Sequence, residues 1–320
     1  MNTTSLKIGS LFSGYGGLDI ATQNTFGGQL AWWSDIEPGP KKIMSHHHPH
    51  APNLEDITRV DWHDVEPVDI IAGGSPCQDL STAGKRQGMK TGTRSGLWAS
   101  MADAIDTIKP RLVVWENVLG ALSSEAVSSM EQCEFCMGDS APSLRALGRV
   151  LGDLTEIGYY TGWQTLRAST IGAPHHRERV FVLAIRNDVP AHAVRVRQYG
   201  GGNGRIESRP ARLPGQTIVP AIRTIPRRLE PFGPYARAVH TWETVLGREA
   251  PPVATTGPKG GWRMNPAFVE WMMGLPEGHI TQVPALTWQE AIRALGNGVI
   301  PQQAEHALRA ITQMLQSELK

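Results

Sequence analysis

Cys77 has the setting of a nucleophile in an α/β protein. It follows an apolar run, Val68–Ala72, and the pair Gly73-Gly74. If the run is a buried strand, Cys77 lies on a loop at the carboxyl edge of a sheet, where open α/β sheets bind their ligands. A thiol at that edge can serve as a nucleophile. A lone cysteine is more often a small buried apolar residue, but the glycines and Pro76 favour an exposed loop and a chemical role.

A glutamate and two arginines could assist such a nucleophile. Glu116 directly follows the apolar run Leu112–Trp115, which places its carboxylate at the same sheet edge. A glutamate near an aromatic base can act as an acid; the alternative is a simple charge at a helix N-terminus. Arg177 and Arg179 precede the run Val180–Ile185 and could bind a phosphate or a base carbonyl, although arginines that flank a strand are common.

The glycine-rich segment Phe12–Gly17 follows a predicted strand that begins at Lys7. Glycines at a strand-to-helix turn let a ligand approach the backbone. By itself the segment could serve NAD, FAD, S-adenosylmethionine or only a tight turn, and its G-x-G-G spacing differs from the dinucleotide G-x-G-x-x-G pattern. Asp35 ends the predicted strand Leu30–Ser34, 19 residues after Gly16, and would suit ribose hydroxyls. The alternative is a solvent-facing loop aspartate.

Strands and helices alternate over the first 185 residues, which predicts an α/β fold with a mostly parallel sheet and crossover helices. The strands are expected at Lys7–Ser13, Leu30–Ser34, Val68–Ala72, Leu112–Trp115 and Val180–Ile185. The helices are expected at Pro38–His47, Leu97–Ile108 and Ser143–Ile157, the last with Ser143 as its N-cap and Gly158 at its end. Helical patterns return at Pro266–Met273 and Pro301–Leu319.

Composition describes a soluble globular chain, with 40% hydrophobic and 19% charged residues. Residues 186–262 form a loop-rich segment with 12 Lys or Arg against five Asp or Glu, a net charge of +7 in a chain of net charge +1. Such a block suits phosphate contact; the alternative is a solvated, arginine-biased loop region. Neither a secretory signal nor an apolar run that could cross a membrane is evident. Three cysteines do not make a disulfide framework, so a cytoplasmic setting is expected.

Taken together, six blocks in order resemble the cytosine-5 DNA methyltransferase family over nearly the whole chain. They are Ser10–Leu18, Gly73–Gln78, Glu116–Val118, Arg177–Arg179, Met273–Pro276 and Leu295–Pro301. The resemblance implies a Rossmann-like S-adenosylmethionine-dependent catalytic domain over residues 1–185. It further implies a target-recognition domain over 186–262 and a C-terminal segment, 263–320, that returns to the catalytic domain.

The resemblance also implies the site residues. The catalytic residues would be Cys77, Glu116, Arg177 and Arg179. S-adenosylmethionine would be bound by Phe12, Ser13, Gly14, Gly16, Gly17, Leu18, Asp35, Ile36, Asp56, Ile57, Pro76, Asn297 and Val299, and no metal is expected. The sequence departs from the family pattern where Ser10 replaces a usual Asp, Asp35 a usual Glu, Ile36 a frequent aromatic, and His175 and His176 a usual Gln and basic residue.

The implied activity is transfer of a methyl group to C5 of a cytosine flipped out of double-stranded DNA at a specific short sequence, through a covalent bond between Cys77 and C6. Double-stranded DNA is the expected partner of a monomeric enzyme, and a cognate restriction endonuclease is a candidate second partner. The expected setting is the cytoplasm of a bacterium or of a phage-infected host.

Two further segments carry hypotheses. The polar, glycine-rich stretch Asp79–Gly96 is predicted to be a mobile lid that closes over DNA, against the alternative of a loop without that role. Cys133 and Cys136 form a CxxC without two further ligands nearby, so a surface insertion is expected rather than a zinc site. The rival functions are a tRNA cytosine-5 methyltransferase on the same fold, an inactive DNA-binding homologue and a nicotinamide-dependent dehydrogenase.

Overall fold

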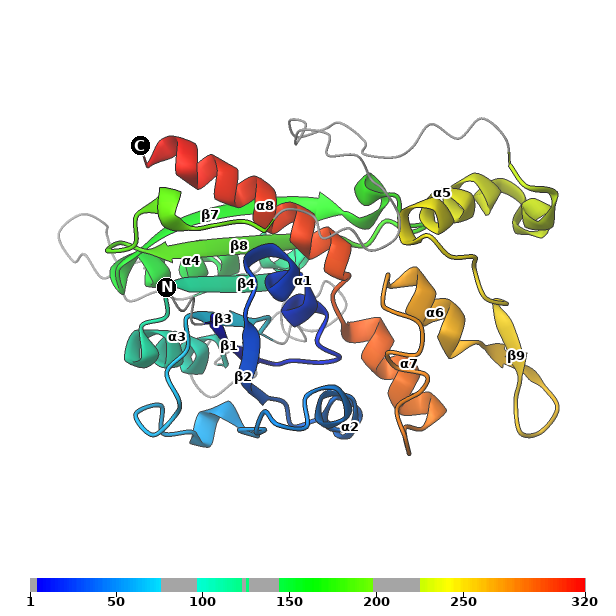
Figure 1. The fold of residues 1–320 in the computed structure, drawn as a ribbon, viewed down its shortest axis with the longest axis horizontal. Coiled ribbons are helices and arrows are strands. Elements are labelled where there is room, and N and C mark those ends of the chain that lie inside the picture. Colours follow the sequence, from blue (N-terminus) through cyan, green and yellow to red (C-terminus); the bar gives the residue numbers. More distant parts are fainter. Residues whose placement is uncertain (1–4, 76–96, 123–124, 127–143, 198–224, 320) are drawn as a thin grey trace.

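A six-stranded sheet forms the centre of the protein (Figure 1). The computed structural model describes residues 5–75, 97–122, 125–126, 144–197 and 225–319. The strand order is β2-β1-β3-β4-β8-β7. Neighbours among β1 to β4 run parallel, and β8 runs antiparallel to both β4 and β7. The prediction of a mostly parallel α/β sheet is therefore confirmed. The strands are β1 (Lys7–Leu11), β2 (Gln29–Ser34), β3 (Ile70–Gly73), β4 (Leu112–Val118), β7 (Tyr159–Arg167) and β8 (Glu178–Arg186).

Helices cover both faces of this sheet because its inner strands are apolar on both sides. Val114 and Leu183 face α1 (Gly17–Phe26) and α8 (Pro301–Glu318). Their neighbours Val113 and Val182 face the opposite layer. That second layer consists of α3 (Leu97–Ile108) and α4 (Ala146–Glu156). Because successive side chains of a strand point to opposite faces of the sheet, the sheet packs against two separate hydrophobic cores.

The register of the strands places three strand ends side by side. Leu11 pairs with Gly73, and Gly73 pairs with Trp115. The segments that follow β1 and β3, and the end of β4, therefore meet at one edge of the sheet. The beginning of β8 lies at the same edge, since Arg179 pairs with Val118.

A second group of elements lies beyond this edge, on the side toward which β4 and β7 point (Figure 1). It contains α5 (Ala236–Leu246), a hairpin of β9 (Ala254–Thr256) and β10 (Trp262–Met264), α6 (Pro266–Met272) and α7 (Trp288–Asn297). The remaining short elements are α2 (Pro38–His47), η1 (Ile57–Arg59), η3 (Leu119–Leu122), β5 (Glu125–Ala126), β6 (Leu144–Arg145), η5 (Ala168–Ile171), η6 (Ala191–Ala193) and η7 (Arg227–Tyr235). The predicted domain boundary after residue 262 falls inside β10.

Several predicted elements need correction. The strand predicted for Lys7–Ser13 ends at Leu11, because Phe12 turns into the left-handed region with φ 55°. β4 runs on to Val118, so Glu116 lies within the strand and pairs with β8 rather than following the strand. The helix predicted from Ser143 begins at Ala146, because Leu144–Arg145 pairs with Glu125–Ala126; Ser143 itself is outside the described residues.

The sequence prediction gave no bounds for α1, β7, α5 or α7, for the β5–β6 and β9–β10 pairs, or for the 3-10 helices. Residues 186–262 contain η6, η7, α5 and β9 and are therefore less irregular than the predicted loop-rich segment, although 198–224 are outside the described residues. Among the described residues, no helix has the length and apolar character needed to cross a membrane.

Candidate active site

The glycine-rich turn after β1 is shaped for close approach. Phe12, Gly14 and Gly16 have φ values of 55°, 58° and 81°. The backbone N–H of Gly14 donates to Asp35 Oδ2 at 2.9 Å. A Cβ at Gly17 would lie 2.1 Å from the carbonyl oxygen of Val299, so no larger residue fits there. The turn is therefore held in one conformation by its neighbours.

Tyr15 ties this turn to the C-terminal segment. Its buried ring donates from Oη to the Val299 carbonyl oxygen at 2.7 Å. A Cβ at Gly298 would come within 1.8 Å of the ring, which explains the glycine at that position. His279 Nε2 donates to the Tyr15 carbonyl oxygen at 2.8 Å, and its ring stacks on His47 at a centroid distance of 4.0 Å. Neither Tyr15 nor His279 carries a predicted role, because their partners lie more than 260 residues away in the sequence.

Asp35, predicted to bind ribose, follows β2 and borders the turn. Besides the bond from Gly14, its Oδ1 accepts from the Glu37 N–H at 2.9 Å. Burial raises the pKa of the Asp35 carboxyl, and these backbone N–H groups oppose the rise. The next side chain, Ile36, is 61% exposed. An apolar side chain presented to solvent beside a carboxylate is a suitable platform for a nucleoside.

The other predicted cofactor residues are distributed around this region. Leu18 is buried in the first turn of α1, and the Ser13 hydroxyl accepts from Ser10 Oγ at 2.8 Å. Asp56 caps η1 by accepting from the Thr58 N–H at 3.0 Å, and Ile57 is buried in the core shared with α3. Asn297 is exposed at the end of α7. Pro76 is outside the described residues.

Asp19 is a buried carboxylate directly beneath the turn. It is 2% exposed, and neither carboxylate oxygen has a hydrogen-bond partner among the described residues. Burial raises the pKa of Asp19 to about 7. Ser10 thus stands where the family pattern has an aspartate, and the buried acid Asp19 lies nine residues further along the chain.

Glu116 and Arg179 form an ion pair at the sheet edge, with Arg179 Nε 2.9 Å from Glu116 Oε1. Their side chains are only 11% and 14% exposed. Burial raises the pKa of Glu116, and the positive charges of Arg179 and Arg177 act against this rise. A carboxyl with these opposing influences is able to hold a proton or to give it up during a reaction.

Arg177 has a different environment from Arg179. Its Nη1 donates to the Gly296 carbonyl oxygen at 3.0 Å, and its Nη2 donates to the Gly298 carbonyl oxygen. It therefore joins the start of β8 to the end of α7, close to the residues around Tyr15. His175 Nε2 lies 3.2 Å from the Met272 carbonyl oxygen, and burial lowers the pKa of His175.

The segment that leads to Cys77 is anchored beside Glu116. A Cβ at Gly74 would lie 3.1 Å from Glu116 Oε2, so the backbone passes directly over that carboxylate. Asn117 Nδ2 donates to the Ser75 carbonyl oxygen at 3.1 Å. Ser75 is the last described residue of this segment; Cys77 and the predicted lid Asp79–Gly96 are outside the described residues, as are Cys133 and Cys136.

The residues at this edge fit S-adenosylmethionine. The turn offers glycines and backbone N–H groups, Asp35 offers a carboxylate, and Ile36 offers an exposed apolar side chain. A cofactor with a ribose and an adenine has a complementary group for each. No cluster of three or more potential metal ligands occurs among the described residues.

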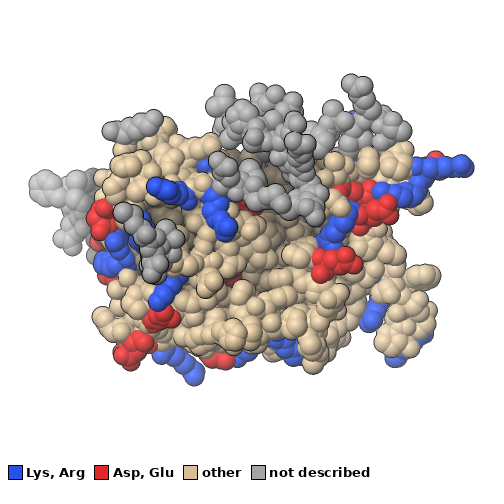
Figure 2. Space-filling view, viewed as in Figure 1, with Lys and Arg blue, Asp and Glu red and all other residues tan. Residues whose placement is uncertain are grey.

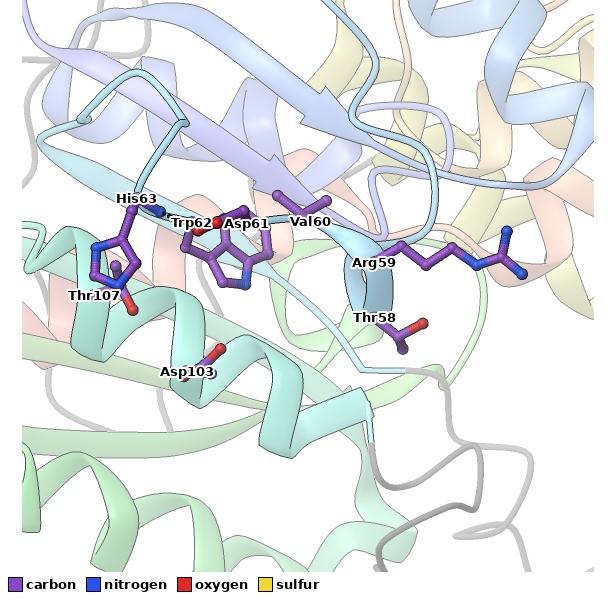
Figure 3. Close-up of a pocket in the computed structure, with 8 residues that line it drawn as sticks. All are labelled: Thr58, Arg59, Val60, Asp61, Trp62, His63, Asp103 and Thr107. Atoms are coloured by element: carbon purple, nitrogen blue, oxygen red, sulfur yellow. Dashed lines mark hydrogen bonds between the residues drawn. The ribbon is translucent and has the colours of Figure 1, made fainter.

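A separate open hollow of about 380 Å³ lies between the η1 segment and α3 (Figure 3). Asp61, His63 and Asp103 contribute to its lining. Asp61 Oδ1 accepts from the backbone N–H of His63 at 3.0 Å. None of the predicted site residues lines this hollow.

The parallel sheet, the glycine-rich turn and the buried Glu116–Arg179 pair together define a Rossmann-like methyltransferase. The family model for C-5 cytosine-specific DNA methylase matches residues 6–200. The chain therefore belongs to the C-5 cytosine-specific DNA methylase family, whose members use S-adenosylmethionine as methyl donor.

The curated relatives are named as methyltransferases of more than one kind. The chain is 27% identical over 190 residues to the type II methyltransferase M.NgoBV of Neisseria gonorrhoeae, which covers 58% of this chain and 42% of the relative. It is 31% identical over 218 residues to a protein of Escherichia phage P1 named DNA N-6-adenine-methyltransferase, with 56% of this chain and 28% of the relative covered. The chain thus spans less than half the length of these curated relatives.

Solved structures confirm the fold. The S. pombe Dnmt2 methyltransferase superposes with a TM-score of 0.59 at 15% identity, over 98% of this chain and 99% of that one. A putative DNA modification methyltransferase encoded within a prophage of E. coli gives a TM-score of 0.55 at 17% identity, over 97% and 99% of the two chains.

Proposed function

We propose that this protein is a DNA cytosine-5-methyltransferase that modifies a cytosine flipped out of double-stranded DNA at a specific short sequence. The observation that carries the proposal is the buried Glu116–Arg179 pair beside the segment that leads to Cys77, in a chain of the C-5 cytosine-specific DNA methylase family. A carboxyl and a guanidinium at one sheet edge can together bind the polar edge of a pyrimidine.

The proposed chemistry begins with activation of the ring, because C5 of cytosine is a poor nucleophile. The Cys77 thiolate adds to C6, and the electrons displaced from the C5–C6 double bond move toward N3. Glu116 stabilises that charge by donating a proton or hydrogen bond to N3. Arg179 holds the base carbonyl. When bound, S-adenosylmethionine would supply an electrophilic methyl group for C5 and leave as S-adenosylhomocysteine. Transfer of the C5 proton to a base, with expulsion of Cys77 as the thiolate, restores the aromatic ring.

The raised pKa of Glu116 supports this role, because burial favours the protonated carboxyl, which is the form that can donate to N3. Arg177 has its guanidinium directed to the carbonyls of Gly296 and Gly298. We therefore propose that Arg177 positions the C-terminal segment over the cofactor turn, whereas Arg179 contacts the base.

The remaining parts of the proposal concern organisation and partners. Residues 1–185 would form the catalytic domain, 186–262 the target-recognition domain, and 263–320 the segment that completes the cofactor pocket. Asp79–Gly96 would be the lid that closes after the base leaves the stack, since extrusion costs a few kcal/mol and needs compensating contacts. The enzyme would act as a monomer, with a restriction endonuclease as a candidate partner.

Expression in a host without cytosine methylation, followed by bisulfite sequencing of the host DNA, tests the activity. We expect protected cytosines at one short recurring sequence, and none with Cys77→Ser. In a second test, duplexes carrying 5-fluorocytosine at that sequence should trap a covalent adduct through Cys77. Methyl transfer to tRNA but not to DNA, or an adduct that survives Cys77→Ser, would refute the proposal.

A further inference from the structure

The hairpin of β9 and β10 presents an unusually exposed tryptophan. Trp262 is 81% exposed, more than any other large apolar side chain among the described residues. Met264, on the same side of β10, is 48% exposed. Exposure of an indole to water forgoes the stabilisation that burial would give. An exposed ring of this size on a projecting element is therefore a candidate contact for a partner.

The ring is exposed although the hairpin that carries it is well anchored. At its base, Trp288 Nε1 donates to the Met264 carbonyl oxygen at 3.0 Å, and the Arg263 guanidinium stacks on the Trp288 ring at 5.4 Å. The Asn265 N–H donates to the Val253 carbonyl oxygen at 3.0 Å. At its tip, the Gly257 N–H donates to the Gly261 carbonyl oxygen at 2.7 Å. A two-stranded hairpin is marginal by itself, so these contacts fix the direction in which Trp262 projects.

The charge of the hairpin indicates the kind of partner. Residues 250–269 contain Lys259 and Arg263 but no Asp or Glu. Lys259 is exposed at the tip. In the space-filling view the lobe at the lower right, which contains the hairpin, shows Lys and Arg but no acidic side chain on this face (Figure 2). A basic, aromatic surface without acids is suited to a polyanion with exposed ring edges.

The hairpin also has a suitable position and width. It lies beyond α6, on the side of the molecule toward which β4 points (Figure 1). DNA bound at the sheet edge would extend past this hairpin. The major groove of B-DNA is about 12 Å wide and admits a two-stranded ribbon, whose strands are about 4.8 Å apart.

We propose that the β9–β10 hairpin enters the major groove of the DNA substrate, with Trp262 packed against base edges and Lys259 on a phosphate. The inference rests on the proposed function, because it assumes that double-stranded DNA is the substrate. It assigns a DNA-reading element whose second strand extends past the predicted end of the target-recognition domain.

Binding measurements on the full chain test the proposal. The probe is a set of sheared duplex fragments from the methylation-free host, and the matched control is Trp163→Ala, which removes a 45% exposed tryptophan from the edge strand β7. Trp262→Ala should weaken duplex binding about tenfold, as loss of one good base-edge contact in the major groove does. Lys259→Gln should lower the salt dependence by about one phosphate contact. Trp163→Ala should leave both unchanged.

Two controls make the result decisive. The Kd for S-adenosylhomocysteine should be the same in all variants, which separates a lost DNA contact from misfolding. Protection of guanine N7 from dimethyl sulfate reports on the major groove; the wild type should protect a patch that Trp262→Ala exposes. If the wild type methylates DNA and Trp262→Ala binds duplex equally well, the hairpin proposal is wrong while the proposed function stands. A Trp262→Ala change that only dissociates a dimer would also overturn it. If the wild type neither binds nor methylates DNA, the proposed function itself fails.

Discussion

Asp19→Asn should stabilise the protein at alkaline pH and have much less effect at acid pH. The wild-type carboxyl is 2% exposed and has no hydrogen-bond partner among the described residues, so its ionisation within the fold is unfavourable. Burial raises the pKa of Asp19 from 3.8 to about 7. Between these values the folded protein keeps a proton that the unfolded chain has released. The contribution of this proton to the free energy of unfolding is therefore full below pH 3.8, the pKa of the aspartate in the unfolded chain. It is lost as the pH rises through about 7, the pKa in the folded protein.

The size of the effect follows from the shift in pKa. Each pKa unit corresponds to about 1.4 kcal/mol. Between about pH 5 and about pH 8 the wild-type protein should lose roughly 2.5 kcal/mol of unfolding free energy through this group, whereas an asparagine loses none. The difference between Asp19→Asn and wild type should thus increase by that amount over the same range.

Urea unfolding of the cofactor-free protein at the two pH values measures this difference. Asp64→Asn is the matched control, because Asp64 is exposed and the variant removes the same charge. Its effect should be small and should not grow with pH. If Asp19→Asn changes the unfolding free energy by the same amount at both pH values, Asp19 does not ionise against a burial penalty and the reasoning fails.

Three further predictions concern the candidate site. Glu116→Gln should lower methyl transfer by about a hundredfold or more, as loss of a general acid does, while the Kd for S-adenosylhomocysteine stays constant; unchanged turnover would exclude the acid role. Arg179→Ala should reduce the unfolding free energy by about 3 kcal/mol, because Glu116 is left buried without its partner. Arg167→Ala breaks an ion pair whose arginine is 62% exposed, so this control should cost less than about 1 kcal/mol. Equal losses of the two variants in urea unfolding would contradict the prediction. Burial lowers the pKa of His279 to about 4, so its ring should remain neutral in an NMR titration down to about pH 5 and the protein should lose stability as the pH falls below about 6.5; a His279 resonance that titrates near pH 6.5 would show that the ring is solvated.

Sequence patterns predicted the elements that depend on local signals. The helices Pro38–His47 and Leu97–Ile108 have the predicted bounds. In the first, proline stands at the position where its missing N–H costs nothing. The strands β4 and β8 were found because they are continuous apolar runs. These strands are also the ones that place Glu116 and Arg179.

The elements that escaped prediction depend on tertiary contacts or on signals that were not used. β7 contains Gly162 and several polar residues, and it becomes a strand because it pairs with β8 along its whole length. α7 had a local signal: Thr287 and Glu290 form a capping box at its start. The family resemblance predicts the site residues, whereas the burial of Asp19 without a partner among the described residues and the contact between Tyr15 and Val299 depend on the folded arrangement.

The contacts around Tyr15 can form only late in the synthesis of the chain. The turn after β1 leaves the ribosome long before Val299, because this partner of Tyr15 lies 284 residues further along the chain. Gln303, at the start of α8, then donates to the carbonyl oxygens of Leu166 and Arg177 and so closes the sheet edge. A nascent chain without α8 therefore lacks the hydrogen bonds from Gln303 that close this sheet edge.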